Sequence, residues 1–385
     1  MKIGIDISQL NYEGTGVANF TYNLVKNLLA ADKKNEYRLF YASFHKFNLP
    51  ALFEFEKLGA KIYRYPIPHK VLHFLWGKQS LLPIDLLTGR VEVFLFSDYL
   101  RPPTFYKTKG VTVIHDLIWK LFPEKHNDEI IRFQELKIKK TIENGDMIVT
   151  DSECTKNDLL KLYQQINKNK VHVIYPGISE NFRPINDKEK TKEVLKKYEI
   201  NYPSNFLLYV GAIEPRKNLD KSIEVFAQLI KDKKYRNFDF LIAGRAGWRK
   251  ENVYQKVRDL QLEEKVKFIG FVDDEDLPYL YNAASLTVYL SSHEGFGLPP
   301  LESLACGTKV IAGDNSSLKE TIDKEFLVDV NDKKKVLEKM KYLLENKIEI
   351  NSKAVKEKFA WKNSAQQFLK IISCRISSNP HPSSF

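Results

Sequence analysis

Cysteine is scarce in this 385-residue chain, which contains only Cys154, Cys306 and Cys374. These are widely spaced and form no Cys-x-x-Cys pair, which argues against a disulfide framework or a cysteine zinc site and favours a reducing compartment. Long apolar runs are also absent, and no stretch approaches the ~20 residues that a membrane helix needs. Residues 1–7, with Asp6 inside the apolar run, predict a first β-strand and not a signal peptide. We therefore expect a cytoplasmic protein that is soluble or peripheral at the inner face of the plasma membrane.

Familiar nucleotide and metal motifs are missing as well. The segment Asn11–Val17 contains Gly14 and Gly16 but lacks the third glycine of a dinucleotide-binding fingerprint, and no lysine-terminated phosphate loop is present. No Asp-x-Asp metal motif is assigned, so we expect no metal and no separate cofactor, with positive side chains in place of a divalent ion.

Positive charge is in excess, with 60 Lys and Arg against 49 Asp and Glu, a formal net charge of +11. Such an excess is compatible with nucleic acid, anionic lipid or a phosphorylated substrate as partner. The basic residues are mostly interspersed with acidic ones, and the densest cluster, at 188–197, is typical of a solvated helix. Because no nucleic-acid-binding motif accompanies the charge, nucleic acid is not expected, and peripheral contact with an anionic membrane is favoured over it.

Short apolar runs alternate with longer amphipathic segments, which is typical of parallel sheets covered on both faces and predicts a doubly wound α/β fold. Expected strands are Ile3–Ile7, Tyr37–Ala42, Val91–Phe96, Val111–Ile114, Met147–Thr150, Val171–Tyr175, Phe206–Val210, Phe238–Ile242, Val266–Ile269, Leu286–Leu290 and Lys309–Ala312. Expected helices include Val17–Leu29, Asn127–Thr141, Leu219–Ile230 and Leu318–Ile322.

The alternation begins afresh near residue 205, after a segment rich in turn residues. This restart predicts an N-terminal domain at 1–185 and a C-terminal domain at 186–358. A segment with helical periodicity follows at 359–374. The Ser/Pro-rich tail at 375–385 is expected to be disordered.

The most informative segment is His293–Thr308, in which an expected strand runs into the glycine loop Gly295–Gly297. Pro299 and Pro300 suit the first turn of a following helix. A helix start of this kind attracts anions, and a diphosphate is the anion that we expect to bind there. Glu294 precedes the loop and Glu302 is placed in the first helical turn, where carboxylates suit binding of sugar or ribose hydroxyl groups. For Glu302, simple compensation of the helix dipole is the alternative.

Glu294 and Glu302, with seven residues between them, resemble the Glu-x7-Glu signature of the retaining glycosyltransferases of family four, also called glycosyl transferases group 1. The segment Tyr209–Asn218 is similar to the family's first C-terminal strand and loop, where an Arg and a Lys hold the donor diphosphate. Arg216 and Lys217 are the matching positions. Ala212 departs from the Arg found in many members, as Lys309 departs from the usual proline.

The resemblance implies the GT-B fold: two Rossmann-like domains with a cleft between them, the C-terminal one binding a nucleotide-sugar donor and the N-terminal one the acceptor. The helix at 359–374 would cross back onto the N-terminal domain. Catalytic roles are implied for Glu294, Arg216, Lys217 and His115. Donor-binding roles are implied for Glu302, Gly295, Phe296, Gly297, Leu298, Gly14, Gly16, Gly211, Arg245 and Phe271.

Several of these positions have ordinary alternatives. His115 follows an expected strand and resembles the family's His-Asp motif, whose histidine contacts the donor sugar, but a buried, hydrogen-bonded core histidine is the alternative. Asp116 is expected to order its own loop. A tight turn is the rival interpretation for Gly14 and Gly16. The aromatic and basic segment His69–Trp76 is interpreted as the face of a core helix, with membrane contact as the alternative.

The donor and acceptor remain open at this level. The motif forms look most like mannosyltransferases that use GDP-mannose to extend a glycan or lipid-linked saccharide in cell-surface polysaccharide synthesis. Rhamnosyl, glucosyl and N-acetylglucosaminyl transfer share the scaffold. A GT-B nucleotide-sugar epimerase and a catalytically inactive sugar-binding protein are the alternatives from other classes.

Overall fold

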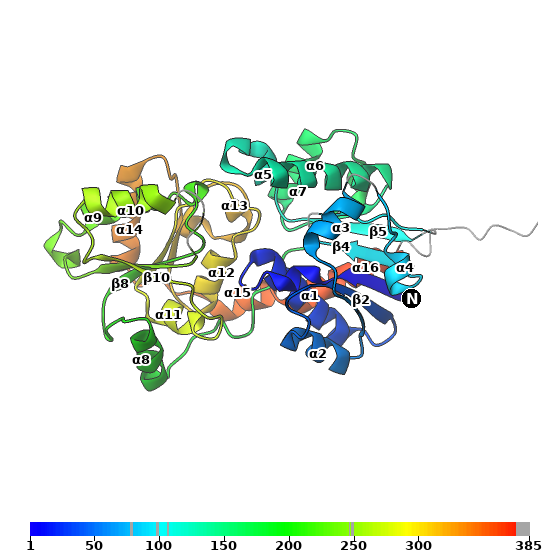
Figure 1. Ribbon diagram of the computed structural model, residues 1–385. Helices are drawn as coiled ribbons and strands as arrows, with labels where there is room; N and C mark the ends of the chain where they lie inside the picture. The colour runs from blue at the N-terminus through cyan, green and yellow to red at the C-terminus, as the bar shows by residue number, and fades with distance from the viewer. Residues whose placement is uncertain (78–79, 98–99, 106–107, 246, 248–249, 375–385) are drawn as a thin grey trace, which may run out of the picture. The chain divides into compact units, whose positions relative to one another are not determined.

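The computed structural model describes residues 1–77, 80–97, 100–105, 108–245, 247 and 250–374 (Figure 1). The chain divides into two compact units, one formed by Met1–Gly177 with the residues from Phe359 onward and the other by Ile178–Lys358. The first boundary therefore lies eight residues before the predicted one at 185. The predicted disordered tail, 375–385, lies outside the described residues.

The first unit is built on a seven-stranded parallel sheet with the strand order β3-β2-β1-β4-β5-β6-β7. Its elements are β1 (Lys2–Asp6), η1 (Ser8–Asn11), α1 (Gly16–Ala31), β2 (Glu36–Ala42), α2 (Pro50–Lys57), β3 (Lys61–Tyr65), α3 (His69–Trp76), α4 (Asp85–Thr88), β4 (Val93–Phe96), β5 (Lys109–Ile114), α5 (Ile118–Leu121), η2 (Pro123–Lys125), α6 (Asp128–Glu143), β6 (Met147–Thr150), α7 (Glu153–Leu162), η3 (Lys168–Lys170), β7 (Val171–Val173) and α16 (Trp361–Cys374).

The C-terminal helix α16 belongs to this first unit, where it packs against α1 (Figure 1). Phe368 and Ile372 of α16 share one hydrophobic core with Leu24 and Leu28 of α1. The start of the helix is anchored because the Ser364 hydroxyl donates to the carbonyl oxygen of Tyr175 at 2.6 Å. The chain thus returns to its first sheet after completing the second.

The second unit holds a six-stranded parallel sheet with the order β10-β9-β8-β11-β12-β13. Its elements are α8 (Lys188–Lys197), β8 (Phe206–Val210), η4 (Pro215–Lys217), α9 (Leu219–Leu229), η5 (Lys233–Tyr235), β9 (Asp239–Ala243), α10 (Lys250–Asp259), β10 (Val266–Gly270), α11 (Leu277–Ala283), β11 (Leu286–Tyr289), α12 (Leu298–Ala305), β12 (Val310–Gly313), α13 (Leu318–Thr321), η6 (Lys324–Phe326), β13 (Leu327–Val328), α14 (Lys333–Glu345) and α15 (Ser352–Lys358).

The order of this sheet reverses between β8 and β11, which are neighbours in space although two strands separate them in sequence. In open α/β sheets the crevice outside such a switch point, at the carboxyl ends of the strands, is the preferred place for a ligand. The loops that follow β8 and β11 flank that crevice, and the signature segments occupy these two loops.

The predicted doubly wound fold is confirmed, and its central strands are buried throughout, as in β4 and β11. Strand β3 was not predicted. All five of its side chains, Lys61–Tyr65, are exposed or half-buried because it is an edge strand, so its sequence lacks the continuous apolar run used to find the others.

Candidate active site

The loop after β11 turns sharply into α12 at Gly297. This residue has φ +90°, and a Cβ built on it would lie 2.6 Å from Cδ2 of Leu318, so both backbone conformation and space demand glycine. The helix begins at Leu298 with Pro299 and Pro300 in its first turn, as predicted. Because the two prolines have no N–H, the donors that this helix start can offer to an anion are those of Gly297 and Leu298.

Glu294, directly before the glycine loop, forms ion pairs with both predicted cations, Arg216 and Lys217. Arg216 Nη1 lies 2.8 Å from Oε2, and Lys217 Nζ lies 2.5 Å from Oε1. Glu294 and Lys217 are buried, and Arg216 is partly buried. The structure therefore brings three of the four predicted catalytic residues into one charged cluster on the second unit.

Tyr289, the last residue of β11, contacts this cluster through Lys217. Its hydroxyl lies 2.5 Å from Lys217 Nζ, and the same ammonium stands 4.7 Å from the centre of its ring. A buried ammonium thus has a carboxylate and a hydroxyl as partners, which offsets much of the cost of removing its charge from water.

Hydrogen bonds between the two loops fix the cluster. The Ser292 N–H donates to the carbonyl oxygen of Arg216 at 2.8 Å, and Asn218 Nδ2 donates to the carbonyl oxygen of Leu290 at 2.9 Å. Asn218 itself adopts a left-handed conformation with φ +50°, which asparagine tolerates better than most residues. The positions of Arg216 and Lys217 are therefore set by backbone bonds as well as by their own ion pairs.

The charge state of Glu294 follows from its surroundings. Burial by itself raises the pKa of a carboxyl group, but the positive charges of Arg216 and Lys217 outweigh it and lower the pKa of Glu294 to about 2. The carboxylate is thus ionised at neutral pH and can accept hydrogen bonds from hydroxyl groups.

Glu302 has the opposite environment. It is the fifth residue of α12, so it lies one turn beyond the first turn predicted for it, and compensation of the helix dipole is not its role. Its carboxyl is buried and accepts a 3.0 Å hydrogen bond from the Tyr281 hydroxyl of α11. Burial raises the pKa of Glu302 to about 7, and the nearby negative charge of Asp274 adds to the increase.

Gly211, Arg245 and Phe271 follow the three neighbouring strands β8, β9 and β10 of the same sheet. The Gly211 N–H donates to the carbonyl oxygen of Ala243, which joins the first two of these loops. The guanidinium carbon of Arg245 stands 4.7 Å from the centre of the exposed Phe271 ring. This pair offers a flat cationic and aromatic surface of the kind on which a nucleobase can stack.

The remaining predicted residues of the glycine loop lie at the same carboxyl edge of the second sheet, after β11. Gly295 and Phe296 are buried, and Leu298 is half-buried at the helix start. The predicted donor-binding set on the second unit therefore occupies the carboxyl ends of β8, β9, β10 and β11. Whether these residues bind a donor stays a prediction.

His115, Gly14 and Gly16 lie on the first unit. Gly14 has φ +73°, as a tight turn demands, whereas a Cβ on Gly16, the first residue of α1, would meet open space. The turn alone explains why residue 14 is a glycine. At residue 16, by contrast, packing would allow a side chain, so packing does not explain the glycine there.

His115 follows β5 and pairs with a residue that the sequence analysis did not single out. Its Nδ1 lies 2.7 Å from Oδ2 of the buried Asp151, and Phe20 packs edge-on against the imidazole with ring centres 4.8 Å apart. Nε2 of His115 and Oδ1 of Asp151 are buried, and neither has a hydrogen-bond partner among the described residues. Asp116 does order its own loop, because its Oδ1 accepts from the N–H of Ile118 at 3.0 Å.

The sequence held a signal for Asp151. It comes directly after β6 just as His115 comes directly after β5, and these strands are neighbours in register, with Ile114 opposite Thr150. Residues that follow adjacent parallel strands lie at one sheet edge. Pairing the expected strands 111–114 and 147–150 would have revealed the contact.

One Asp-x-Asp string was overlooked, at Asp274–Asp276. Asp276 precedes α11 and accepts hydrogen bonds from Lys197 Nζ at 2.7 Å and from the Tyr198 hydroxyl at 2.8 Å. These partners hold one of the two carboxylates in the fold, so the string does not present two free carboxylates to a metal ion.

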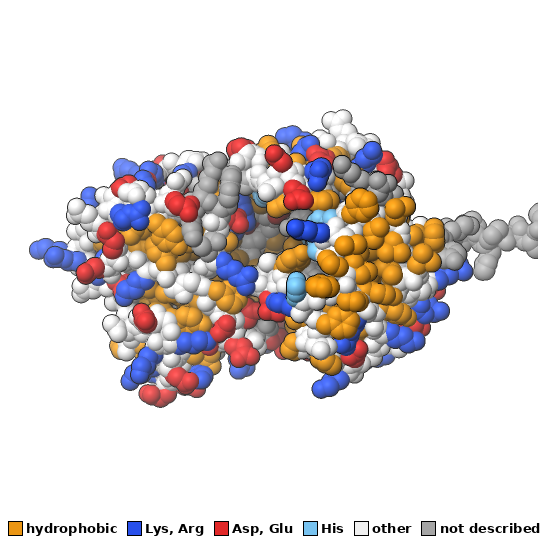
Figure 2. Space-filling view, in the orientation of Figure 1, with side chains coloured by type: hydrophobic (Ala, Val, Ile, Leu, Met, Phe, Trp, Pro, Cys, Tyr) orange, Lys and Arg blue, Asp and Glu red, His pale blue; other side chains and the backbone are white. Residues whose placement is uncertain are grey.

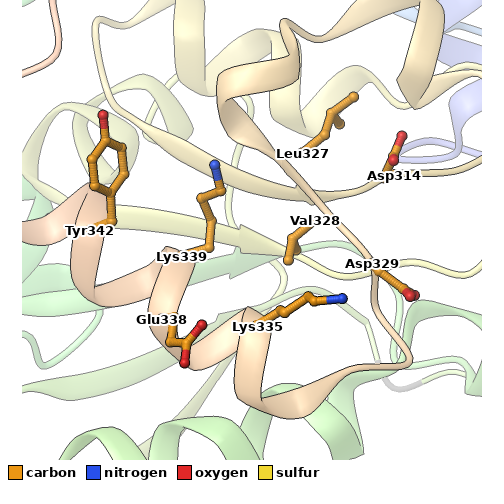
Figure 3. A pocket seen from close by; sticks show the side chains of 8 residues that line it. All are labelled: Asp314, Leu327, Val328, Asp329, Lys335, Glu338, Lys339 and Tyr342. Atoms are coloured by element: carbon orange, nitrogen blue, oxygen red, sulfur yellow. The ribbon is translucent and has the colours of Figure 1, made fainter.

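A pocket of about 430 Å³ is found elsewhere on the second unit, between β13 and α14 (Figure 3). Figure 3 shows Asp329, Lys335 and Lys339 among its lining side chains. None of the predicted site residues lines this pocket, and we assign it no role in catalysis.

Comparison with known proteins agrees with the motifs in both units. Residues 14–182 match the family Glycosyltransferase Family 4, and residues 190–362 match the family Glycosyl transferases group 1. The protein therefore belongs to the glycosyltransferases of this family, and the two parallel-sheet units are the domains of the GT-B fold. Its enzymatic class is that of the hexosyltransferases.

Individual relatives narrow the resemblance to mannosyltransferases. The chain is 29% identical to O-antigen chain mannosyltransferase B of Escherichia coli, over 86% of this chain and 87% of that protein. It is 32% identical to the serotype-specific mannosyltransferase WbdA of Escherichia coli over 67% of this chain, but spans only 32% of that longer protein.

A solved structure supports the fold independently. Sucrose-phosphate synthase from Thermosynechococcus elongatus is similar with a TM-score of 0.72 at 18% identity, over 98% of this chain and 100% of that one. At this identity the likeness concerns the fold alone.

Proposed function

We propose that this glycosyltransferase transfers mannose from GDP-mannose, with retention of configuration, to a glycan or lipid-linked saccharide acceptor in cell-surface polysaccharide synthesis. The observation that carries the proposal is the buried cluster of Glu294, Arg216 and Lys217 beside the start of α12. Two cations next to a helix start suit a diphosphate leaving group, and an ionised carboxylate suits the hydroxyl groups of the sugar.

In the proposed reaction the bond between C1 of the sugar and the diphosphate oxygen breaks through an oxocarbenium-like state. The acceptor hydroxyl attacks from the face that the diphosphate leaves, and its proton passes to the departing phosphate oxygen, so charge and atoms balance without a protein nucleophile. Arg216, Lys217 and the N–H groups of Gly297 and Leu298 stabilise the negative charge that develops on the diphosphate. No cofactor or metal ion takes part in this scheme.

The other predicted residues receive positioning roles. Glu294 holds ring hydroxyl groups of the donor sugar, Glu302 holds the ribose, and Arg245 with Phe271 flanks the base. On the first unit, Nε2 of His115 accepts from a hydroxyl group of the donor sugar, since Asp151 engages the other ring nitrogen. Gly14 and Gly16 let the backbone approach the donor phosphates.

The choice of mannose is supported by the names of the relatives and by the motif forms at Tyr209–Asn218 and His293–Thr308. Glucosyl, rhamnosyl and N-acetylglucosaminyl donors are the alternatives that the experiment must separate. We also propose that the protein works at the inner face of the plasma membrane, where lipid-linked acceptors are located.

Thermal unfolding in the presence of nucleotides tests the donor directly. A ligand that binds the folded state at 100 times its Kd stabilises the protein by about 2.7 kcal/mol. We expect GDP and GDP-mannose to raise the melting temperature and UDP to raise it little. If no nucleoside diphosphate shifts the transition, the proposed donor site is wrong.

The fate of GDP-mannose distinguishes the remaining classes. With an acceptor saccharide present, NMR should show a new α-mannoside, which is the retained configuration. An epimerase would instead convert GDP-mannose to an isomer without any acceptor, and a sugar-binding protein would bind it unchanged. Either outcome would overturn the proposal.

A further inference from the structure

An exposed apolar surface on the first unit is unused by the proposed reaction. It consists of Val71 and Phe74 of α3, Leu81, Leu86 of α4, and Phe105, and we call these five residues the apolar patch. Phe74 and Leu86 are each 61% exposed, and the other three are 43–51% exposed. Figure 2 shows hydrophobic side chains gathered over the part of this unit where α3 and α4 lie in Figure 1.

Backbone hydrogen bonds tie the segments of the patch together. The N–H of Leu81 donates to the carbonyl oxygen of Leu75 at 2.8 Å, which places Leu81 against the end of α3. The N–H of Phe105 donates to Oδ2 of Asp85, the neighbour of Leu86, at 2.7 Å. Trp76 of α3 and Ile84, directly before α4, also belong to one hydrophobic core cluster, so the segments that carry the patch are packed together.

Helix α3 has one buried and one exposed apolar face. The buried face fits the core-helix interpretation of its sequence, and the exposed face is the one that could contact a membrane. Leu72 and Trp76 point into the core and are almost fully buried, as predicted for a core helix. Val71 and Phe74, on the other side of the same helix, are exposed. A helix that needed only to cover the core would carry polar residues at these positions.

Basic residues outnumber acidic ones in the segment that carries four of the five patch residues. Residues 61–91 contain the basic residues Lys61, Arg64, Lys70, Lys78 and Arg90, and their only acidic residue is Asp85. The segment that leads on to Phe105 adds Glu92 and Asp98. Lys61 and Arg64 form ion pairs with Glu36 and Glu56, so only Lys70 and Arg90 are assigned a role at this surface. Asp85 is buried and accepts hydrogen bonds from the Phe105 N–H and the Thr108 hydroxyl. Lys70 and Arg90 are exposed. In the described part of residues 61–91, positive side chains are therefore exposed and no carboxylate is.

We propose that the apolar patch is the surface by which this protein docks on an anionic lipid bilayer. Aromatic and leucine side chains enter the boundary between headgroups and acyl chains, while Lys70 and Arg90 attract the anionic headgroups. Among the described helices none has the length and apolar character to cross a bilayer, so the contact is with the lipid surface. The inference rests on the proposed function in one respect, because a lipid-linked acceptor would be reached from this position.

Sedimentation with lipid vesicles tests the proposal without any use of activity. The full-length protein should bind vesicles of equal parts phosphatidylcholine and phosphatidylglycerol, and bind vesicles of phosphatidylcholine alone much more weakly. The double variant Phe74→Ser/Leu86→Ser should lower the partition coefficient about tenfold or more, since both side chains lose apolar area that the membrane would bury. Lys70→Glu should lower it by a similar factor, and only at low salt.

Tyr342→Ser is the matched control, because Tyr342 is an exposed aromatic side chain of α14 on the second unit. It should leave vesicle binding unchanged. Equal vesicle binding by wild type and the Phe74/Leu86 variant would overturn the proposal. So would a wild-type dimer that this variant converts to a monomer without vesicle binding by either form, since the patch would then cover a second copy of the chain.

Nucleotide binding separates this inference from the proposed function. The Phe74→Ser/Leu86→Ser protein should show the same GDP-induced rise in melting temperature as wild type, which also verifies its fold. Loss of vesicle binding with normal GDP binding supports the patch. Absence of GDP binding in wild type would refute the donor site and leave the vesicle result standing.

Discussion

The ammonium of Lys217 lies 2.5 Å from a carboxylate oxygen of Glu294, and both side chains are buried at the switch point of the second sheet. The pair links the two loops in which the family's signature residues occur. Glu294 compensates the positive charges of Arg216 and Lys217, which in the proposed reaction would face the diphosphate. Ion pairs and loop hydrogen bonds hold these cations in place, so the proposed donor site is preorganised.

Breaking this pair from one side should destabilise the protein strongly. Lys217→Met is expected to lower the free energy of unfolding by about 3 kcal/mol, because it removes one of the two cations that compensate a buried carboxylate. The double variant Lys217→Met/Glu294→Gln should be more stable than the sum of the single effects predicts. Urea unfolding followed by far-UV circular dichroism measures both. Strictly additive effects would show that the two residues are not coupled.

Arg216 should matter for turnover more than for folding. Its loop is held by backbone bonds, so Arg216→Ala should keep the fold, although the loss of a cation from buried Glu294 should lower the melting temperature. Turnover is therefore compared at a temperature where both proteins are folded. The turnover number should fall about 100-fold, as expected when one group that stabilises developing charge is removed. Arg216→Lys keeps the positive charge but not the planar guanidinium, so its turnover number should lie between those of wild type and Arg216→Ala. Normal turnover of the alanine variant would remove the assigned role.

Glu302 should make stability depend on pH. Its pKa of about 7 in the folded protein lies above the unfolded value of 4.5, so the folded state binds more protons between these values. Stability should therefore fall as the pH rises from about 4.5 to 7 and stay constant above that. Glu302→Gln should lack this loss and exceed wild type at pH 8 by a difference on the order of 3 kcal/mol. The melting temperatures of both proteins are measured from about pH 5 to about pH 8. If the melting temperatures of the two proteins change with pH in parallel, the expectation is wrong.

Asp151 should act through His115 and not through the fold alone. With its Nδ1–H donating to Asp151, His115 presents Nε2 as an acceptor, whereas an asparagine amide at 151 could donate to Nδ1 and reverse the tautomer. Asp151→Asn should therefore lower turnover about 10- to 100-fold and change the pH profile of the rate. The decisive control is His115→Ala, in which the further substitution Asp151→Asn should cost little activity. A full additional loss in the double variant would mean that Asp151 acts independently.

Much of the fold and part of the site could be predicted because they depend on local sequence. Continuous apolar runs such as Phe206–Val210 identify buried parallel strands, and the glycine loop with Pro299 and Pro300 identifies a helix start. Arg216, Lys217 and Glu294 could be assigned to one site from their motifs. Asp151 was missed because its importance lies in a partner 36 residues away.

The sequence by itself determined the alternation of strands and helices, the two sheets and the residue types of the signature loops, because each follows from side-chain period and backbone chemistry over short distances. Only the tertiary structure decided the charge states of Glu294 and Glu302, since one carboxyl is buried between two cations and the other beside a tyrosine hydroxyl. It also decided that α3 buries one apolar face and exposes another. These properties depend on what surrounds a side chain in space, and residues distant in the chain supply those surroundings.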